Sequence, residues 1–305
     1  MTDLFRALAD PTRLRIVALL GQMELAVGEL AQVLGQSQPR VSRHVKILCD
    51  AGLARRRREG SWVFLTPGEA TIAEPLAALI SAAGGAELGR EDVAHLAAIR
   101  AERAVAAERF FASHAHEWDA LRSLHASDEA VEAAMHHLLP APLGRVVDLG
   151  TGTGRMLELF GGTNAIGLDR SPEMLRLARA KLDGRGVELR QGEVTALPLA
   201  DGIADTVIVH QVLHYLADPA AAIAEAARIL GPGGRLLVAD FASHDHEELR
   251  DTAAHARLGF DDSQIAGWLA DAGLALDATE TLEGGKLTVK LWRAAKPAQS
   301  RKLAA

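Results

Sequence analysis

Apolar positions follow two different periods along the chain, and the change of period divides it into two parts. Up to residue 140 apolar residues mostly recur every three or four positions, which is typical of amphipathic helices. From residue 145 onward, short runs of Val, Ile, Leu and Ala alternate with helical stretches. This order predicts a mostly parallel sheet with helices on both faces, so we expect an α/β part behind a helical N-terminal part.

The first 65 residues predict short helices followed by a hairpin. Asp10 and Pro11 are typical of a helix start, because Asp caps free N–H groups and Pro fits the first turn. Residues 29–34 predict a second helix that ends at Gly35, and residues 37–49 predict a third. This succession of short helices is typical of a helix-turn-helix.

The third predicted helix has one apolar stripe and one polar face. Val41, Val45 and Leu48 recur at helical spacing and should be buried together. After this helix, residues 53–57 and 62–65 predict two strands that form a wing. The polar face of the helix and the wing are therefore the candidate interaction surfaces.

The C-terminal part predicts seven short strands. The last two are joined through two consecutive glycines and should form a terminal hairpin. The predicted strands cover residues 146–149, 165–168, 187–190, 206–209, 235–239, 274–281 and 287–292. We expect a seven-stranded, mostly parallel, doubly wound sheet.

Charge is distributed unevenly between the two parts. The chain has 305 residues and a formal net charge of −7. Residues 1–68 contain ten Lys and Arg against six Asp and Glu, so they carry +4 and the remainder −11. A basic head on an acidic body indicates that only the head meets a polyanion.

Cysteine content and hydropathy favour a cytoplasmic protein. Cys49 is the only cysteine, so an internal disulfide is excluded. The sequence shows no apolar run of about 20 residues and no signal-peptide pattern at its start. We expect a cytoplasmic protein that does not enter a membrane.

A glycine-rich loop follows the first strand of the C-terminal part. Three glycines alternate with threonines in DLGTGTG, residues 148–154, and Asp169 stands at the end of the second strand, 19 positions after Gly150. Glycines allow a ligand to approach the backbone, and a carboxylate at this place can accept both hydroxyls of a ribose. The pattern predicts a nucleotide-type ligand. A nicotinamide dinucleotide and a domain that has lost its ligand are the alternatives.

Five blocks of the C-terminal part occur in the order found in class I S-adenosylmethionine (SAM) dependent methyltransferases. They are DLGTGTG, GLDRSPEML, QGEVTALPLADGIADTVI, HQVLHYLADP and ILGPGGRLLVADF. Residues 110–293 resemble this class, especially the small-molecule methyltransferases of the ubiquinone and menaquinone type. The resemblance implies a Rossmann-like fold that binds SAM or S-adenosylhomocysteine (SAH). The residues it implies for the ligand are Asp148, Gly150, Gly152, Gly154, Asp169, Arg170, Met174, Glu193, Val194 and His210.

Residues 3–65 are similar to the winged helix-turn-helix of ArsR-type repressors. The similarity extends through ALADPTRLRIVALL and the segment from Glu24 to Leu65. It implies that the third helix enters the major groove of double-stranded DNA and that the wing adds backbone contacts. The DNA-binding residues implied are Gln38, Arg40, Ser42, Arg43, His44, Lys46, Arg55, Arg56, Arg57 and Arg58. A protein-binding winged helix is the alternative.

Metal sensing is not expected of this winged helix. Many ArsR-type proteins use a cysteine pair in their ELCVCDL segment, whereas this chain has Ala26 and Gly28 there. Soft metals require thiolates, and Cys49 alone cannot provide such a site. Asp92 and His95 stand in a region that could hold a harder metal, but they lack a convincing pattern of partners.

Four residues are candidate bases for methyl transfer, which sometimes needs a base near the nucleophile. They are His210, His214, Tyr215 and Asp240, and each has packing at a helix start or strand end as its alternative role. The sequence identifies no methyl acceptor. Catalytic residues are therefore unknown at this stage, and enzyme activity stays open.

The two resemblances together imply a transcriptional regulator that senses SAM or SAH, most simply a SAH-responsive repressor of methionine-cycle genes. ArsR-type proteins are homodimers on inverted-repeat operators. We expect a DNA-binding domain at residues 1–68, a helical linker and dimerisation region at 69–140, a ligand-binding domain at 141–296 and a disordered tail at 297–305. The alternatives are an active small-molecule methyltransferase with an appended DNA-binding domain, and a methyltransferase with a protein-binding winged helix.

Overall fold

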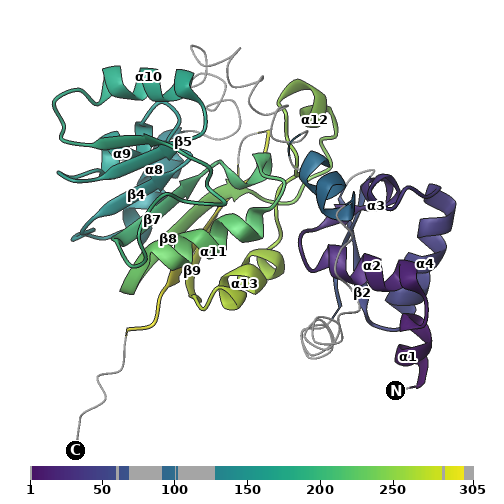
Figure 1. The fold of residues 1–305 in the computed structure, drawn as a ribbon. Helices are drawn as coiled ribbons and strands as arrows, with labels where there is room; N and C mark the ends of the chain where they lie inside the picture. Colours follow the sequence, from purple (N-terminus) through teal and green to yellow (C-terminus); the bar gives the residue numbers. More distant parts are fainter. Residues whose placement is uncertain are drawn as a thin grey trace, which may run out of the picture. The chain divides into compact units, whose positions relative to one another are not determined.

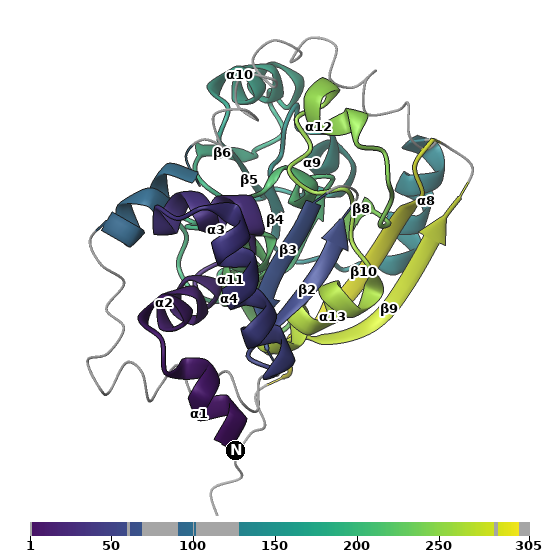
Figure 2. The same ribbon diagram turned by 90° about the vertical axis from the view of Figure 1, so that its right-hand side faces the viewer.

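The computed structural model describes residues 2–59, 62–68, 91–99, 101, 128–283 and 286–298. The chain divides into two compact units, residues 1–103 and residues 104–305. Figures 1 and 2 show each unit as a ribbon with its own layered arrangement. Much of the predicted dimerisation region and the tips of the wing and of the terminal hairpin lie outside the described residues.

The first unit is a winged helix. Its strands pair in the order β1-β3-β2, all antiparallel. Its elements are α1 (Thr2–Leu8), α2 (Pro11–Leu20), β1 (Leu25–Ala26), α3 (Val27–Leu34), α4 (Gln38–Asp50), β2 (Ala54–Glu59) and β3 (Trp62–Pro67). The predicted helices and wing are therefore present, and β1 is a short third strand that the sequence pattern did not indicate.

Local sequence signals explain where the helices of this unit begin and end. The Asp10 side chain accepts a hydrogen bond from the Arg13 backbone N–H at 3.2 Å, which caps α2. Gly35 ends α3 with a left-handed φ of 62°. On α4 the side chains of Val41, Val45 and Leu48 are all 0% exposed, so the predicted apolar stripe is confirmed.

The second unit is built on a seven-stranded sheet in the order β6-β5-β4-β7-β8-β10-β9. The first five strands are parallel, and β10 is antiparallel to both β8 and β9. The strands are β4 (Val146–Leu149), β5 (Ile166–Asp169), β6 (Glu188–Gln191), β7 (Ala204–His210), β8 (Leu230–Phe241), β9 (Ala275–Leu282) and β10 (Val289–Ala295). The predicted mostly parallel sheet and the predicted terminal hairpin are both confirmed.

Helices cover both faces of this sheet (Figure 1). One core cluster joins the sheet to α11 (Pro219–Ile229) and α13 (Asp262–Asp271). The other joins it to α8 (Asp128–Leu138) and α9 (Arg155–Phe160). Strand residues alternate between the clusters, as the consecutive Val207 and Ile208 on β7 illustrate, so both faces of the central strands are apolar.

Helix α8 lies in the range that the sequence assigned to a linker, residues 69–140. In the structure its buried side chains include Val131, Met135 and Leu138, and the helix contacts β9 and β10. It therefore belongs to the core of the second unit. Of the rest of that range, residues 91–99 are helical within the first unit.

Among the residues that the structure describes, no helix is both long enough and apolar enough to cross a membrane.

Candidate ligand-binding and DNA-binding sites

The sheet of the second unit reverses its strand order between β4 and β7. In open α/β sheets, ligands bind outside the carboxyl ends of the strands at such a switch point. The residues predicted for the ligand lie there: Asp148 on β4, Asp169 at the end of β5, Glu193 just after β6 and His210 at the end of β7. The fold therefore gathers residues from four separate parts of the sequence at one edge.

The loop after β4 requires glycine at several positions. Gly150, Gly152 and Gly154 have φ values of 72°, 52° and 86°, a region that residues with a side chain rarely adopt. A Cβ atom on Gly154 would lie 2.7 Å from Cδ1 of Leu182, and one on Gly150 would overlap Val212. The loop can therefore present its backbone closely to a ligand.

Asp169 is the polar centre of this edge. Its Oδ2 accepts a hydrogen bond from the Gly152 N–H, and its Oδ1 accepts one from the Ser171 N–H, both at 2.8 Å. Burial raises the pKa of the Asp169 carboxyl, although these backbone donors oppose the shift. A carboxylate has about four lone-pair positions, so these donors leave room for it to accept a hydroxyl of a ribose.

The remaining predicted ligand residues surround Asp169. Arg170 Nε lies 2.9 Å from Glu193 Oε1, and this exposed ion pair links the end of β5 to the segment after β6. Val194 is buried beside Glu193 and offers an apolar surface. Met174 is buried in α10 (Pro172–Lys181), where its backbone N–H is capped by the Ser171 hydroxyl at 3.3 Å.

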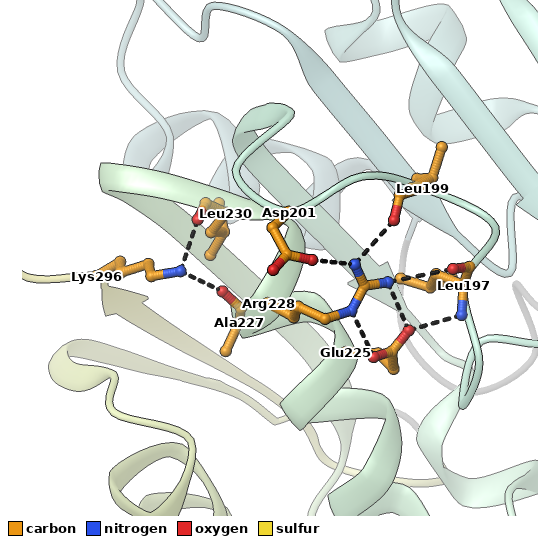
Figure 3. Close-up of polar contacts among 8 residues, drawn as sticks. All are labelled: Leu197, Leu199, Asp201, Glu225, Ala227, Arg228, Leu230 and Lys296. Carbon is orange, nitrogen blue, oxygen red and sulfur yellow. Dashed lines mark hydrogen bonds and ion pairs between the residues drawn. The ribbon is translucent and has the colours of Figure 1, made fainter.

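The segment after Glu193 is held by a network that the sequence analysis did not identify (Figure 3). Arg228, at the end of α11, donates to the carbonyl oxygens of Leu197 and Leu199 at 3.1 and 2.8 Å and pairs with Asp201. Glu225 pairs with Arg228 and accepts from the Leu197 N–H at 2.7 Å. The i, i+3 spacing of Glu225 and Arg228 in the sequence indicates an ion pair on one helix face. It does not indicate that the pair also forms hydrogen bonds with the backbone of a distant loop.

The candidate bases lie at the ends of β7 and β8. His214, on η2 (Leu213–Tyr215), places its Nδ1 2.7 Å from Asp240 Oδ1, and both side chains are buried. The Tyr215 ring packs against His214, with 3.9 Å between the ring centroids. His210 is 9% exposed at the end of β7. The structure therefore pairs two of the four candidates directly.

On the first unit, α4 presents a polar face. Gln38, Arg40, Arg43 and Lys46 are exposed, and Ser42 is half-buried. Within the described ranges, neither arginine nor Lys46 takes part in an ion pair. These cations are placed to meet a polyanion.

His44 differs from the other predicted DNA-binding residues of α4. Its side chain is only 14% exposed, and its Nδ1 lies 3.8 Å from Asp10 Oδ1 at the start of α2. The side chain is directed toward the interior of the helix-turn-helix. This orientation favours a packing contact between α4 and α2 over a phosphate contact.

The four arginines of the wing are not equivalent. Arg55, Arg56 and Arg58 are exposed. Arg57 instead pairs with Glu24 at 2.9 Å and lies over the Phe64 ring, 5.4 Å from its centroid. Through these two contacts Arg57 braces the wing.

The residues considered for a hard metal have other roles here. Arg15 Nε donates to Asp92 Oδ2 at 2.8 Å, and His95 Nδ1 lies 3.1 Å from the Val33 carbonyl oxygen. In the described ranges, no three His, Cys, Asp or Glu side chains are grouped so that they could hold a metal ion.

In comparisons with known proteins, a part of each unit matches a family model. Residues 10–56 match the family model for the arsR family of bacterial regulatory proteins, and residues 147–238 match the model for a methyltransferase domain. The chain therefore joins an ArsR-family helix-turn-helix to a class I methyltransferase domain. ArsR-family domains of this kind belong to DNA-binding regulators.

Two of the curated relatives each match a part of the chain. The arsenical resistance operon repressor of Escherichia coli is 51% identical over 62 residues, which is 20% of this chain and 53% of that protein. Demethylmenaquinone methyltransferase of Thermus thermophilus is 40% identical over 103 residues, which is 32% of this chain and 47% of that protein. The chain thus spans about half the length of these curated relatives.

A solved structure supports the fold of the second unit. It comes from the complex between the Haloferax volcanii Trm112 methyltransferase activator and a methyltransferase. The match has a TM-score of 0.53 at 25% identity and covers 64% of this chain and 99% of that one.

Proposed function

We propose that this protein is a transcriptional regulator whose first unit binds DNA and whose second unit binds SAM or SAH. The observation that carries the proposal is the Asp169 carboxylate, fixed by the Gly152 and Ser171 N–H groups at the switch point of the sheet. Such a carboxylate, beside a glycine loop, suits a ligand with a ribose. The matches of the two units to their families support the combination.

The ligand residues have distinct proposed roles. The backbone of residues 150–154 and the Asp148 side chain border the methionine part, because they lie at the end of β4. Asp169 holds the ribose, with Arg170 and Met174 near it. Glu193 and Val194 flank the adenine, and His210 lies toward the centre of the ligand.

In the first unit, we propose that α4 enters the major groove. Gln38, Arg40, Ser42 and Arg43 are the candidates for base contacts, and Lys46 for a phosphate contact. Arg55, Arg56 and Arg58 contact the DNA backbone from the wing, because their side chains are exposed. Arg57 supports the wing from inside.

We propose a homodimer on an inverted-repeat operator, because a twofold protein matches a palindromic site. The proposed interface is the predicted region 69–140 apart from α8, which packs against the sheet of the second unit. The proposed role is a repressor of methionine-cycle genes in the cytoplasm.

Calorimetric titration of the full chain with SAM and with SAH tests ligand binding. We expect saturable binding of at least one ligand, and a loss of affinity of at least tenfold in Asp169→Ala. The matched control is Asp277→Ala on β9, an Asp that pairs with Arg293 away from the switch point. Absence of binding by the unchanged protein would refute the ligand assignment.

The second candidate function is an active methyltransferase with an appended DNA-binding domain. The pairing of His214 with Asp240 beside the switch point favours it, because a sensor needs no such pair.

A further inference from the structure

The chain between β6 and β7, residues 192–203, is made of turns and bends. At its start Glu193 and Ala196 form an isolated antiparallel bridge, and the Ala196 N–H donates to the Glu193 carbonyl oxygen at 3.1 Å. We call residues 193–197 the 193–197 turn. A turn has no ladder of hydrogen bonds like that of a helix or sheet, so its shape depends on what holds its two ends.

The start of the 193–197 turn is tied to the carboxyl end of β5. The Gly192 N–H donates to the Asp169 carbonyl oxygen at 3.0 Å. The Arg170 Nε lies 2.9 Å from Oε1 of the Glu193 carboxylate. Asp169 and Arg170 thus hold the start of the turn beside the carboxylate that is proposed to bind the ribose.

The end of the 193–197 turn is tied to α11 by the ion pair of Glu225 and Arg228 (Figure 3). The Leu197 N–H donates to Glu225 Oε2 at 2.7 Å, and the Leu197 carbonyl oxygen accepts from Arg228 Nη2 at 3.1 Å. Both backbone polar groups of Leu197 are therefore held by one ion pair. Two residues further on, the Leu199 carbonyl oxygen accepts from Arg228 Nη1 at 2.8 Å.

Arg228 uses every N–H group of its guanidinium. Its Nε and Nη2 donate to the two carboxylate oxygens of Glu225 at 2.7 and 2.8 Å. The remaining N–H groups donate to the carbonyl oxygens of Leu197 and Leu199 and to Oδ1 of Asp201. A guanidinium presents five donors in a rigid plane, whereas a lysine presents three on a flexible stem. The hydrogen bonds from Arg228 lower the pKa of the Glu225 carboxyl, so the pair stays charged at neutral pH.

Helix α11 is a fixed support for this pair. Its inner side chains belong to the core cluster that joins the helix to the sheet. At its C-terminal end, Lys296 Nζ donates to the carbonyl oxygens of Ala227 and Leu230 at 2.8 and 2.7 Å (Figure 3). A cation at the last carbonyls of a helix stabilises the helix end. Arg228 therefore joins the loop to a helix that is itself held in place.

We propose that Arg228, oriented by Glu225, is the positioning residue for the base of the ligand and makes the site selective for adenine. The inference rests on the proposed function, in which Glu193 and Val194 flank the adenine. Arg228 acts from the end of the 193–197 turn and does not touch the ligand. Because the turn is held at both ends, Glu193 and Val194 are in place before the ligand arrives, which lowers the cost of binding.

The selectivity follows from the donors and acceptors of the base. The amino group of adenine donates hydrogen bonds, and the Glu193 carboxylate only accepts them. Hypoxanthine has a carbonyl oxygen in place of that amino group, so it would set one acceptor against another. A site built to bind an N–H group rejects an analogue that lacks it only if the acceptor cannot move away. Loss of Arg228 frees the turn and so lets Glu193 move.

The test is calorimetric titration of the full chain with SAH and with S-inosylhomocysteine, which carries hypoxanthine as its base. We expect the unchanged protein to prefer SAH by about tenfold or more. Arg228→Gln should bind SAH about tenfold more weakly and reduce the preference to about threefold or less, because its acceptor is no longer held in position. Asp169→Ala, at the proposed ribose contact, should weaken both ligands by the same factor and keep the preference.

Two further variants sharpen the test. Arg228→Lys should keep only part of the preference, because an ammonium group cannot reproduce the planar set of donors. Arg293→Gln is the matched control, since this arginine also pairs with a carboxylate, that of Asp277, and donates to a backbone carbonyl, that of Leu138. It lies on β10, away from the switch point, and should behave as the unchanged protein. A full preference for SAH in Arg228→Gln would overturn the inference.

Failure of this inference can be separated from failure of the proposed function. If the unchanged protein binds neither SAM nor SAH, the proposed function itself is refuted. If it binds SAH but S-inosylhomocysteine equally well, the ligand assignment stands and the positioning role is wrong. Should Arg228→Gln not fold, amide hydrogen exchange of the unchanged protein without ligand decides. The inference requires slow exchange of the Leu197 N–H, and exchange as fast as in an unfolded peptide would overturn it.

Discussion

Asp169 shows how a single side chain is prepared for a ligand by its own backbone. Its two oxygens accept the backbone N–H groups of Gly152 and Ser171, which fixes the carboxylate plane before a ligand arrives. Because burial favours the neutral acid, the carboxyl is held above its ordinary pKa of 3.8. Binding therefore depends on a carboxylate that protonates more easily than a surface aspartate.

This raised pKa predicts how ligand affinity depends on pH. As the pH falls through the raised value, the carboxyl becomes protonated in the folded protein and loses one acceptor for the ribose. We expect SAH affinity to fall on acidification from neutral pH, beginning above the pH at which an ordinary Asp protonates. Calorimetry across this range checks it. An affinity that stays constant until the protein unfolds would contradict the role of Asp169.

Arg57 and Arg56 are neighbours with opposite expected behaviour. Arg57→Ala removes the Glu24 ion pair and the contact with the Phe64 ring, so it should lower the free energy of unfolding by about 1–2 kcal/mol. Arg56→Ala removes an exposed cation and should weaken DNA binding with little change in stability. Chemical denaturation and fluorescence anisotropy of both variants separate the effects. Equal stability losses would refute the distinction.

At the scale of elements, the glycine loop is fitted closely to the helix that follows β5. Gly154→Ala should destabilise the protein by about 2–4 kcal/mol, because the residue has a left-handed φ of 86° and its Cβ would meet Leu182. In a Leu182→Ala background the same change should cost only about 1–2 kcal/mol, the backbone part alone. Denaturant unfolding of the four proteins measures this. Additive costs would show that the contact with Leu182 is unimportant.

The exposed face of α4 carries the prediction for DNA recognition. Arg43→Ala should weaken binding to the operator by about 1–3 kcal/mol, and Lys46→Ala should reduce the salt dependence by about one counterion. Arg179→Ala, on the exposed side of α10 in the second unit, is the matched control. Anisotropy at several salt concentrations distinguishes the two roles. If neither variant differs from the control, α4 is not the recognition helix.

Elements with a strong local signal could be predicted from the sequence, and the others could not. The apolar run of β4 predicted its observed bounds, and Asp10 and Gly35 marked helix ends correctly. Strand β8 begins at Leu230, five residues earlier than predicted, because Gly231–Gly234 reads as a turn in isolation. Pairing of Leu230 with Ala204 on β7 extends it, and only the sheet shows that.

The residues of the candidate site also divide into those that the sequence indicates and those that only the structure shows. The glycine loop and Asp169 are recognisable because ligand contact depends on residue type and position along the chain. The hydrogen bonds from Arg228 to residues 197–201 and the pairing of His214 with Asp240 join residues 26 or more positions apart. The sequence pattern did not indicate these contacts. Side-chain orientation also separates Arg57 from its neighbours, although the sequence presents four identical arginines.

At the scale of the whole molecule, a ligand-responsive regulator requires that the two units communicate. A ligand changes DNA affinity only if it binds the DNA-competent and the incompetent states differently. A coupling free energy of about 1–3 kcal/mol corresponds to about a 5- to 150-fold change in affinity, and it must be reciprocal between DNA and ligand.

The most direct test is fluorescence anisotropy of the full chain on the DNA upstream of its own gene, at one salt concentration. The measurement is made without ligand, with SAM and with SAH, and is repeated with Asp169→Asn. We expect that one ligand shifts the DNA affinity at least severalfold. We expect the Asp169→Asn variant to bind DNA without showing this shift. Equal DNA affinity of the unchanged protein in all three conditions would contradict this expectation.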